Sequence, residues 1–301
     1  MSAIDLYSLS PITLNATTIP IANLNRSPDN DVKPQAHSGN LFPSIMTAPS
    51  AAPRFQFRTP FITAFNLIGF GVLKLTTLNV FLAKFVDFQR SASSVHRKYA
   101  LAASATGCAR ITGFTVEKNG VCWADVEVIL LSSDGLVHPL AVTDNNALPS
   151  VASEPALHTL GPIKINGTTI GGVASLAVDL GHGYEVEISD GDRFARNVAL
   201  LSGAPTISGA FDGPETAGST LGQEGVAISA NFQAFLRDYD TTTGLQDTDG
   251  ISLTIASGRI IPTVAATEYG QIAKGGFMVH GLSSSATHPI VVATGQTVPT
   301  P

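Results

Sequence analysis

Four carboxylates lie close together in a chain that otherwise carries few charges. The segment GYEVEISDGDRFARNVALLSGAP, residues 183–205, contains Glu185, Glu187, Asp190 and Asp192. Carboxylates at this spacing could serve general acid–base catalysis or ligate a metal ion. Side chains two residues apart in a β-strand share a face, so Glu185 and Glu187 project together and His182 projects to the opposite side. The spacing therefore favours a strand with one polar, acidic face over a catalytic or metal site.

A second acidic segment, DYDTTTGLQDTDG, spans residues 238–250 and offers oxygen ligands at Asp238, Asp240, Asp247 and Asp249. Calcium requires several oxygens that converge from a tight turn, and the EF-hand supplies them in a fixed twelve-residue pattern. This segment lacks that pattern, so a solvated surface loop is expected, with calcium binding as the open alternative. No cofactor is expected.

Catalytic motifs are missing from the sequence, which has no G-x-S-x-G elbow, H-E-x-x-H pair or P-loop. We therefore predict that the protein is not an enzyme. The only tryptophan, Trp123, falls in a strand with a core-like sequence, which argues against an exposed aromatic platform for glycans. The net charge of −6 and the single basic cluster, His96-Arg97-Lys98, argue against a dedicated nucleic-acid reader.

The composition points to self-association. Charged residues make up 13% of the chain and apolar residues 44%, whereas a typical soluble domain has about 25% charged residues. The longest apolar tract, residues 61–73, is interrupted by Thr, Asn and Gly and is shorter than the ~18 residues that a bilayer requires, so no membrane partner is expected. The N-terminus has no basic region followed by an apolar one, so no signal peptide is expected. The low charge predicts an obligate homo-oligomer, because permanent interfaces are apolar.

The first 58 residues are rich in proline and show no helical periodicity. This composition predicts an extended arm with little regular structure. Its apolar residues favour contact with a neighbouring subunit, and they are Ile4, Leu6, Tyr7, Ile12, Leu14, Ile19 and Ile21. Thr59-Pro60 then predicts the start of a short helix that ends near residue 68.

Residues 59–285 are predicted to form one all-β domain, a sandwich or barrel flanked by that helix, and residues 286–301 a tail. β-branched or alternating runs separated by turn residues predict strands within residues 72–85, 108–131, 162–170, 175–189, 193–201, 204–211, 226–239, 251–264 and 269–282. In the strand that carries the glutamates, Tyr184, Val186 and Ile188 are expected to face the core.

Two Asn-Gly pairs, at residues 119–120 and 166–167, predict hairpin turns. A two-residue turn at the first pair would place Cys108 opposite Leu131 and Cys122 opposite Glu117. The two cysteines are then far out of register, so we expect reduced thiols that pack in the core.

The order of these elements resembles that of the major tail (tail-tube) proteins of tailed bacteriophages and prophages. The resemblance covers residues 95–280 and is carried by DNNALP (144–149), LHTLGPIKINGTTIGGVASLAVDLG (157–181) and ISDGDRFARNVALLSGAPTISGAF (188–211). It implies a β-sandwich flanked by a helix and assembled as stacked hexameric rings around a channel, through which DNA passes without specific binding. It also implies a place in the virion tail, assembled in the host cytoplasm with other virion structural proteins.

A negative channel wall repels the phosphates of DNA. If the resemblance holds, the carboxylates at 185, 187, 190 and 192 are expected on a water-exposed surface, in the tube lumen or at a contact between rings. An ordinary solvated outer edge is the alternative. Two further classes stay open, a phage capsid or capsid-decoration protein and a glycan-binding β module.

Overall fold

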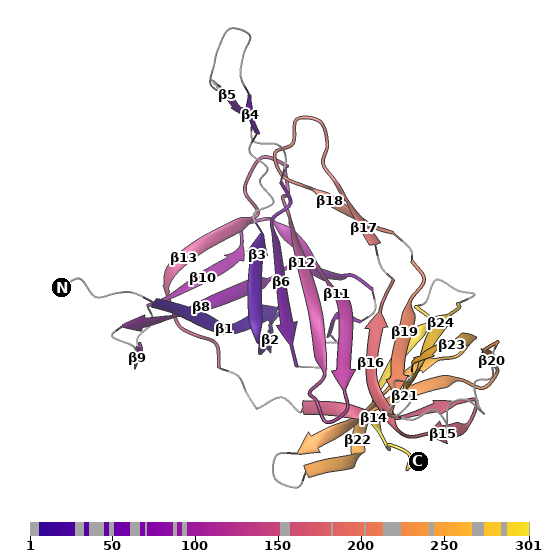
Figure 1. Ribbon diagram of the computed structural model, residues 1–301. Coiled ribbons are helices and arrows are strands. Elements are labelled where there is room, and N and C mark those ends of the chain that lie inside the picture. Colours follow the sequence, from indigo (N-terminus) through magenta and orange to yellow (C-terminus); the bar gives the residue numbers. More distant parts are fainter. Residues whose placement is uncertain are drawn as a thin grey trace.

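The computed structural model describes residues 6–27, 33–35, 45–47, 51–60, 67–69, 71–86, 89–91, 95–150, 157–181, 183–201, 203–212, 224–240, 244–266, 274–283 and 288–300. Within these ranges the chain consists mainly of β-strands that pair in antiparallel fashion (Figure 1). The prediction of an all-β protein is confirmed. Leu67 and Ile68 are helical and Ile68 is buried in the core, whereas residues 61–66 of the predicted helix lie outside the described residues.

One long sheet runs through the molecule. In spatial order its strands are β20 (Val226–Ile228), β23 (Gly258–Ala266), β24 (Lys274–Gly281), β19 (Thr206–Phe211), β16 (Val173–Asp179), β11 (Thr106–Glu117), β12 (Trp123–Leu131), β6 (Arg54–Thr59) and β3 (Asn23–Ser27). A short strand, β7 (Leu73–Leu75), pairs with the first part of β11, and β16 pairs with the last part. Strand β11 therefore joins an N-terminal half to a C-terminal half (Figure 1).

Smaller sheets complete each half. The N-terminal sheet has the order β13 (Leu140–Asn146), β10 (His96–Leu101), β8 (Leu78–Val86), β1 (Leu6–Leu14) and β2 (Thr17–Ile19), with β9 (Gln89–Arg90) on β8. The C-terminal sheet has the order β15 (Thr168–Ile170), β14 (Leu157–Ile165), β21 (Phe232–Asp240), β22 (Gly244–Ile255) and β25 (Ile290–Gln296). Two pairs stand apart, β4 (Lys33–Gln35) with β5 (Ile45–Thr47), and β17 (Gly183–Glu187) with β18 (Asn197–Leu201). We call the β17–β18 pair the ribbon.

A single cluster of buried apolar side chains extends through both halves. In the C-terminal half, the ring centroid of Phe277 lies 5.0 Å from that of Phe211 and 6.0 Å from that of Phe232. These side chains come from β24, β19 and β21, so the long sheet and the C-terminal sheet share this core. Burial of each such side chain stabilises the fold by roughly 1.5–3 kcal/mol.

The prediction of an extended N-terminal arm is wrong for the described residues 6–27. Strand β1 pairs with both β2 and β8, and Ile12, Leu14 and Ile19 are 0% exposed in the core of their own chain. Ile21 packs against the same core. Leu6 and Tyr7 lie in β1 opposite Phe85 and Lys84, and Ile4 lies outside the described residues. The prolines mislead because Pro11 falls at the irregularity between Leu9 and Ile12, where the β1–β8 register shifts.

The C-terminal residues also belong to the domain. Strand β25 pairs with β22, and Ile290 and Val298 are buried. The predicted domain end at residue 285 and the tail that follows it are therefore wrong for the described residues 288–300. The segment was predicted as a tail because it is polar and rich in Thr, and β25 contributes only one face to the core.

The two Asn-Gly turns behave differently. At Asn166-Gly167 both residues have positive φ, 47° and 92°, and the flanking strands pair directly from Ile165 to Thr168, so the predicted two-residue hairpin is confirmed. At the other pair only Asn119 has positive φ, and the ladder resumes at Thr115 opposite Trp123.

The longer connection at Asn119 and a bulge near Thr112 change the register of β11 and β12. Cys108 lies opposite Ile129, so the predicted pairing with Leu131 is wrong. Both cysteines are free and buried, as expected. Burial raises the pKa of Cys108 to about 11 and also raises the pKa of Cys122.

Candidate functional site

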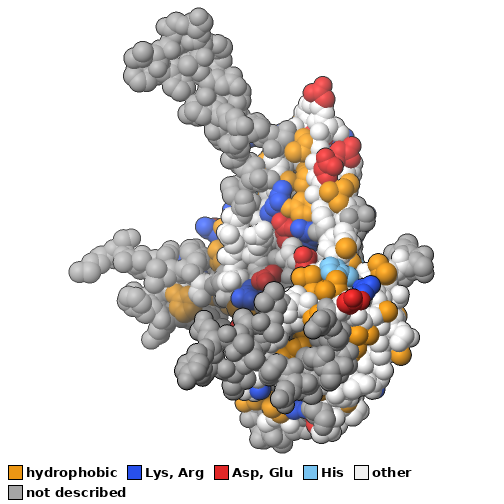
Figure 2. Space-filling model, turned by 45° about the vertical axis from the view of Figure 1, so that its right-hand side comes forward, with side chains coloured by type: hydrophobic (Ala, Val, Ile, Leu, Met, Phe, Trp, Pro, Cys, Tyr) orange, Lys and Arg blue, Asp and Glu red, His pale blue; other side chains and the backbone are white. Residues whose placement is uncertain are grey.

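The ribbon carries the acidic segment of the sequence. Glu185 pairs with Ala199 and Glu187 pairs with Asn197 across the two strands, and both glutamates are exposed. The predicted turn is present, because the Asp192 N–H donates to Ser189 O at 3.0 Å. In Figure 2 acidic side chains gather toward the upper end of the molecule, where the ribbon projects.

The opposite face of the ribbon is packed. Tyr184, Val186, Ile188 and Val198 lie against a small cluster of buried residues, namely Ala52, Cys108, Ile129, Leu131 and Ala195. The alternation predicted for this strand is therefore confirmed. One face of the ribbon is exposed to solvent, and the other packs against the body of the protein.

The four carboxylates do not form one group. Asp190 is exposed at the turn, whereas Asp192 is only partly exposed and lies against the loop that follows β12. A Cβ atom added to Gly135 would lie 2.1 Å from Asp192 Oδ1, so the two segments touch. The backbone N–H groups of Arg193 and Phe194 donate to Gly135 O and fix this contact. Glu185, Glu187 and Asp190 remain as the exposed acidic surface.

A buried carboxylate lies beneath the ribbon, at Glu127 on β12, which is 3% exposed. Arg110 donates from Nε and Nη2 to Glu127 Oε2 at 3.0 and 2.9 Å. The Tyr184 hydroxyl donates to Oε1 at 3.0 Å, and Arg54 Nη1 lies 3.6 Å from the same oxygen. Gln56 Nε2 approaches Oε1 at 3.4 Å. The carboxylate is thus compensated by two guanidinium groups and a phenol.

This network attaches the ribbon to the long sheet. Arg54 also donates to the Tyr184 hydroxyl, and the guanidinium carbon of Arg110 lies 4.2 Å from the centre of the Tyr184 ring. Burial, together with the nearby Glu127 charge, raises the pKa of Tyr184, so the phenol stays protonated and keeps donating. The hydrogen bonds between Tyr184, Arg54 and Glu127 therefore serve to anchor the ribbon to the sheet.

Sequence reasoning missed Glu127, although a signal was present. In WADVEVILL the apolar residues Ala124, Val126 and Val128 alternate with Trp123, Asp125 and Glu127. The structure places Ala124, Val126 and Val128 in the core. Trp123 therefore lies on the outer face, with the Arg58 guanidinium 5.5 Å from its ring centre, and its expected core position is wrong.

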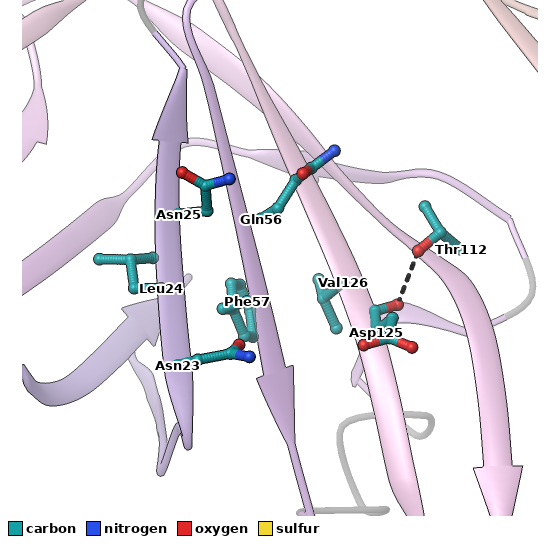
Figure 3. A pocket seen from close by; sticks show the side chains of 8 residues that line it. All are labelled: Asn23, Leu24, Asn25, Gln56, Phe57, Thr112, Asp125 and Val126. Atoms are coloured by element: carbon teal, nitrogen blue, oxygen red, sulfur yellow. Dashed lines mark hydrogen bonds between the residues drawn. The ribbon is translucent and has the colours of Figure 1, made fainter.

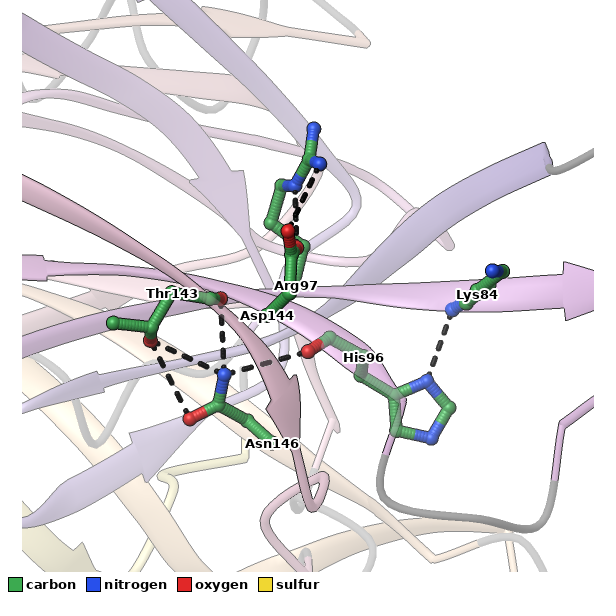
Figure 4. A network of polar contacts seen from close by, with 6 residues as sticks. All are labelled: Lys84, His96, Arg97, Thr143, Asp144 and Asn146. Atoms are coloured by element: carbon green, nitrogen blue, oxygen red, sulfur yellow. Dashed lines mark hydrogen bonds and ion pairs between the residues drawn. The ribbon is translucent and has the colours of Figure 1, made fainter.

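Two residues of the basic cluster of the sequence make structural contacts within the N-terminal sheet (Figure 4). Arg97 Nε donates to Asp144 Oδ1 at 2.8 Å, and this bond lowers the pKa of Asp144. His96 is buried and its Nδ1 accepts from the Lys84 backbone N–H at 3.0 Å. Arg97 is thus compensated by a carboxylate, and His96 is held inside the sheet.

The described parts of the second acidic segment, residues 238–240 and 244–250, lie in strands rather than in a loop. Asp238 on β21 pairs with Gln246 on β22, and Arg237 Nε lies 3.0 Å from Asp247 Oδ1. Asp249 is exposed and adopts a positive φ of 59°. Across the parts of the chain that the structure describes, no set of three or more His, Cys, Asp or Glu side chains converges in a way that could hold a metal ion.

No protein-family model matches the sequence, and comparison with curated proteins gives no match either. None of the helical residues described in the structure belongs to a helix long and apolar enough to cross a membrane.

Proposed function

We propose that this chain is a structural subunit that assembles with copies of itself, as a β-sandwich protein of a phage tail tube arranged in stacked, hexameric rings. It acts in the virion without catalysis or cofactors. The resemblance in the order of its strands supports this assignment, as does a composition with only 13% charged residues.

The observation that carries the proposal is a pair of large, exposed apolar side chains on a loop whose backbone is held by hydrogen bonds. Leu136 is 63% exposed and Val137 is 57% exposed. Asp134 Oδ1 accepts hydrogen bonds from both of their backbone N–H groups, at 2.9 and 3.0 Å, and these bonds lower the pKa of Asp134. Because the loop is already ordered, burying these side chains against a neighbour costs little conformational entropy.

The exposed face of the ribbon supports the more specific role. Glu185, Glu187 and Asp190 are exposed on the ribbon, which projects from the body of the protein. In a tube this face lines the lumen or the contact between rings, where negative charge keeps DNA from adhering.

Electron microscopy of the purified protein tests the assembly. Rings or tubes are expected, and the variants Leu136→Asp and Val137→Asp should remain folded monomers, because a buried unpaired charge disfavours the interface. Thr248→Asp, at an exposed position on β22, is the matched control and should assemble normally. A wild-type protein that stays monomeric by light scattering at micromolar concentration would contradict the proposal, and closed shells would favour a capsid role.

Charge reversal tests the lumen. Glu185→Lys combined with Glu187→Lys should leave assembly intact but slow DNA ejection from virions, more strongly at low salt, where screening is weak. Unchanged ejection at low salt would remove the lumen assignment. Failed assembly would move these residues to a subunit contact.

A further inference from the structure

The outer face of the N-terminal half carries two rows of polar side chains that cross β3, β6, β12 and β11. The strand registers place Asn25, Gln56, Glu127 and Arg110 in one row, and Asn23, Arg58, Asp125 and Gly113 in the other. The side chains that alternate with these, such as Phe57 and Val126, face the core. Among the described residues, the ribbon contacts Glu127 and its arginine partners, at one end of the first row.

A groove of about 450 Å³ lies between these rows (Figure 3). Its polar lining consists of Asn23, Asn25, Gln56, Thr112 and Asp125. Two local features open it. The bulge near Thr112 turns that side chain onto the backbone oxygen of Asp125, to which its hydroxyl donates at 3.2 Å. The next residue, Gly113, has no side chain, and a Cβ atom there would meet Asp125 Oδ2 only at 4.0 Å. Bulges are common beside binding sites because they re-aim side chains.

The charges around the groove compensate one another. Arg58 Nε lies 3.5 Å from Asp125 Oδ1, and Arg54 and Arg110 are engaged by Glu127. An anionic ligand would have to compete with these carboxylates. An apolar ligand would displace the water molecules bound to the amides and the carboxylate and would offer no hydrogen bonds in return. Leaving each of these polar groups unsatisfied costs free energy. A ligand with many hydroxyl groups avoids both penalties, because every hydroxyl donates and accepts.

We propose that this groove binds a neutral glycan. The side-chain amide of Asn25 offers two donors and an acceptor. Gln56 offers its carbonyl oxygen and the amide hydrogen that does not point to Glu127, and Asp125 offers acceptors, which suits the adjacent hydroxyl groups of a sugar. Binding at this face is separate from self-assembly, so either proposal can fail while the other stands.

Binding is tested with a panel of immobilised neutral oligosaccharides, made of glucose, galactose and N-acetylglucosamine units, and with uronic-acid and sulfated oligosaccharides as acidic comparators. We expect the protein to bind at least one neutral member. Gln56→Ala and Asn25→Ala should each weaken that binding about tenfold, the usual effect of one lost hydrogen-bonding group. Gly113→Leu, which places a side chain beside the carboxylate of Asp125, should also weaken it.

Gln296→Ala, on β25 in the C-terminal sheet, is the matched control and should bind like the wild type. Circular dichroism of each variant reports whether it is folded, and Asn25→Ala at an exposed edge position keeps the test informative if Gly113→Leu misfolds. The proposal is overturned if no neutral member binds, if only the acidic comparators bind, or if the folded Gln56→Ala and Asn25→Ala variants bind as tightly as the control.

Discussion

The N-terminal β1–β2 hairpin and the β17–β18 ribbon are both two-stranded antiparallel pairs, yet they occupy opposite situations. Strand β1 has a neighbour on each side, β2 and β8, and its inward side chains Ile12 and Leu14 are completely buried. The ribbon strands pair with each other, and the ribbon contacts the body of the protein through one half-buried face.

The difference shows that neighbours, more than local pattern, decide what a hairpin contributes. An isolated two-stranded hairpin is marginal in water. The β1–β2 hairpin gains stability from the core that it closes. The ribbon relies on a small apolar cluster and on the hydrogen bonds that reach Tyr184 from the sheet. The β1–β2 hairpin is part of the core of the fold. The ribbon is packed on one face only, and its outer face is available for contacts.

Removing the β1–β2 hairpin should have the largest effect. Deletion of residues 1–19 uncovers β8 and removes Ile12, Leu14 and Ile19 from the core. At roughly 1.5–3 kcal/mol each, their burial is comparable to the 5–15 kcal/mol stability of a whole domain. We expect the truncated chain to lose its cooperative urea transition, measured by circular dichroism. Ser8→Ala, exposed on the same strand, is the control and should unfold at the wild-type midpoint. If the truncated chain also unfolded at that midpoint, the hairpin would be an arm that the fold does not need.

Breaking the anchor of the ribbon should come next. Glu127→Ala leaves Arg54 and Arg110 without their shared carboxylate and should reduce the free energy of unfolding by about 3–5 kcal/mol. Hydrogen exchange at the ribbon amides should accelerate more than exchange in β1. Glu187→Ala is the control, because an exposed substitution changes stability by less than about 0.5 kcal/mol. Equal effects of the two variants would mean that the network does not hold the ribbon.

Alkaline pH should weaken the layer beneath the ribbon, where Cys108 lies. Burial raises the pKa of this thiol from 9.0 to about 11, so the unfolded chain loses the proton first. Stability is therefore intact below pH 9 and falls as the pH rises toward 11, by about 2–3 kcal/mol from this group. Comparison of wild type with Cys108→Ala by urea unfolding at pH 8 and pH 10.5 isolates it, since Cys122 is present in both. The variant should lose less stability between the two pH values, and an identical loss would be inconsistent with a buried thiol.

Charge reversal on the wet face of the ribbon should have the smallest effect on folding. Glu185→Lys and Glu187→Lys change exposed side chains, so each should alter the free energy of unfolding by less than about 0.5 kcal/mol. Thermal unfolding at moderate salt measures this. A loss above about 1 kcal/mol would show that the outer face already contributes to the fold, and the contrast with the β1–β2 hairpin would weaken.

Much of the strand content was predictable from the sequence, because alternation has a direct physical cause in the pleat of a strand. The hairpin at Asn166-Gly167 and the two faces around Glu185 followed from it. The N-terminal strands were not predicted, since the interrupted LYSLSPITL reads as irregular when β8, its partner some seventy residues away, is unknown. The register around Cys108 failed for a similar reason, as the bulge near Thr112 has no distinctive local sequence.

The candidate sites were harder to predict than the strands. Exposure of Glu185 and Glu187 followed from periodicity, but the separation of Asp192 depended on contact with Gly135, which is distant in sequence. The buried Glu127 was overlooked because its compensating partners, Arg54, Arg110 and Tyr184, come from three different strands. The groove depends on the lateral alignment of four strands, and that alignment is a property of the sheet.

Because the long sheet is continuous through β11, the N-terminal and C-terminal halves are not independent domains. Phe114 to Glu117 of β11 pair with Ser175 to Val178 of β16, where a boundary between two independent domains would otherwise lie. A fragment that ends before β16 would present β11 as an open edge, and a fragment that begins there would present β16. Open edges of this kind recruit other strands and promote aggregation. Dissection into halves is therefore expected to yield two aggregation-prone fragments.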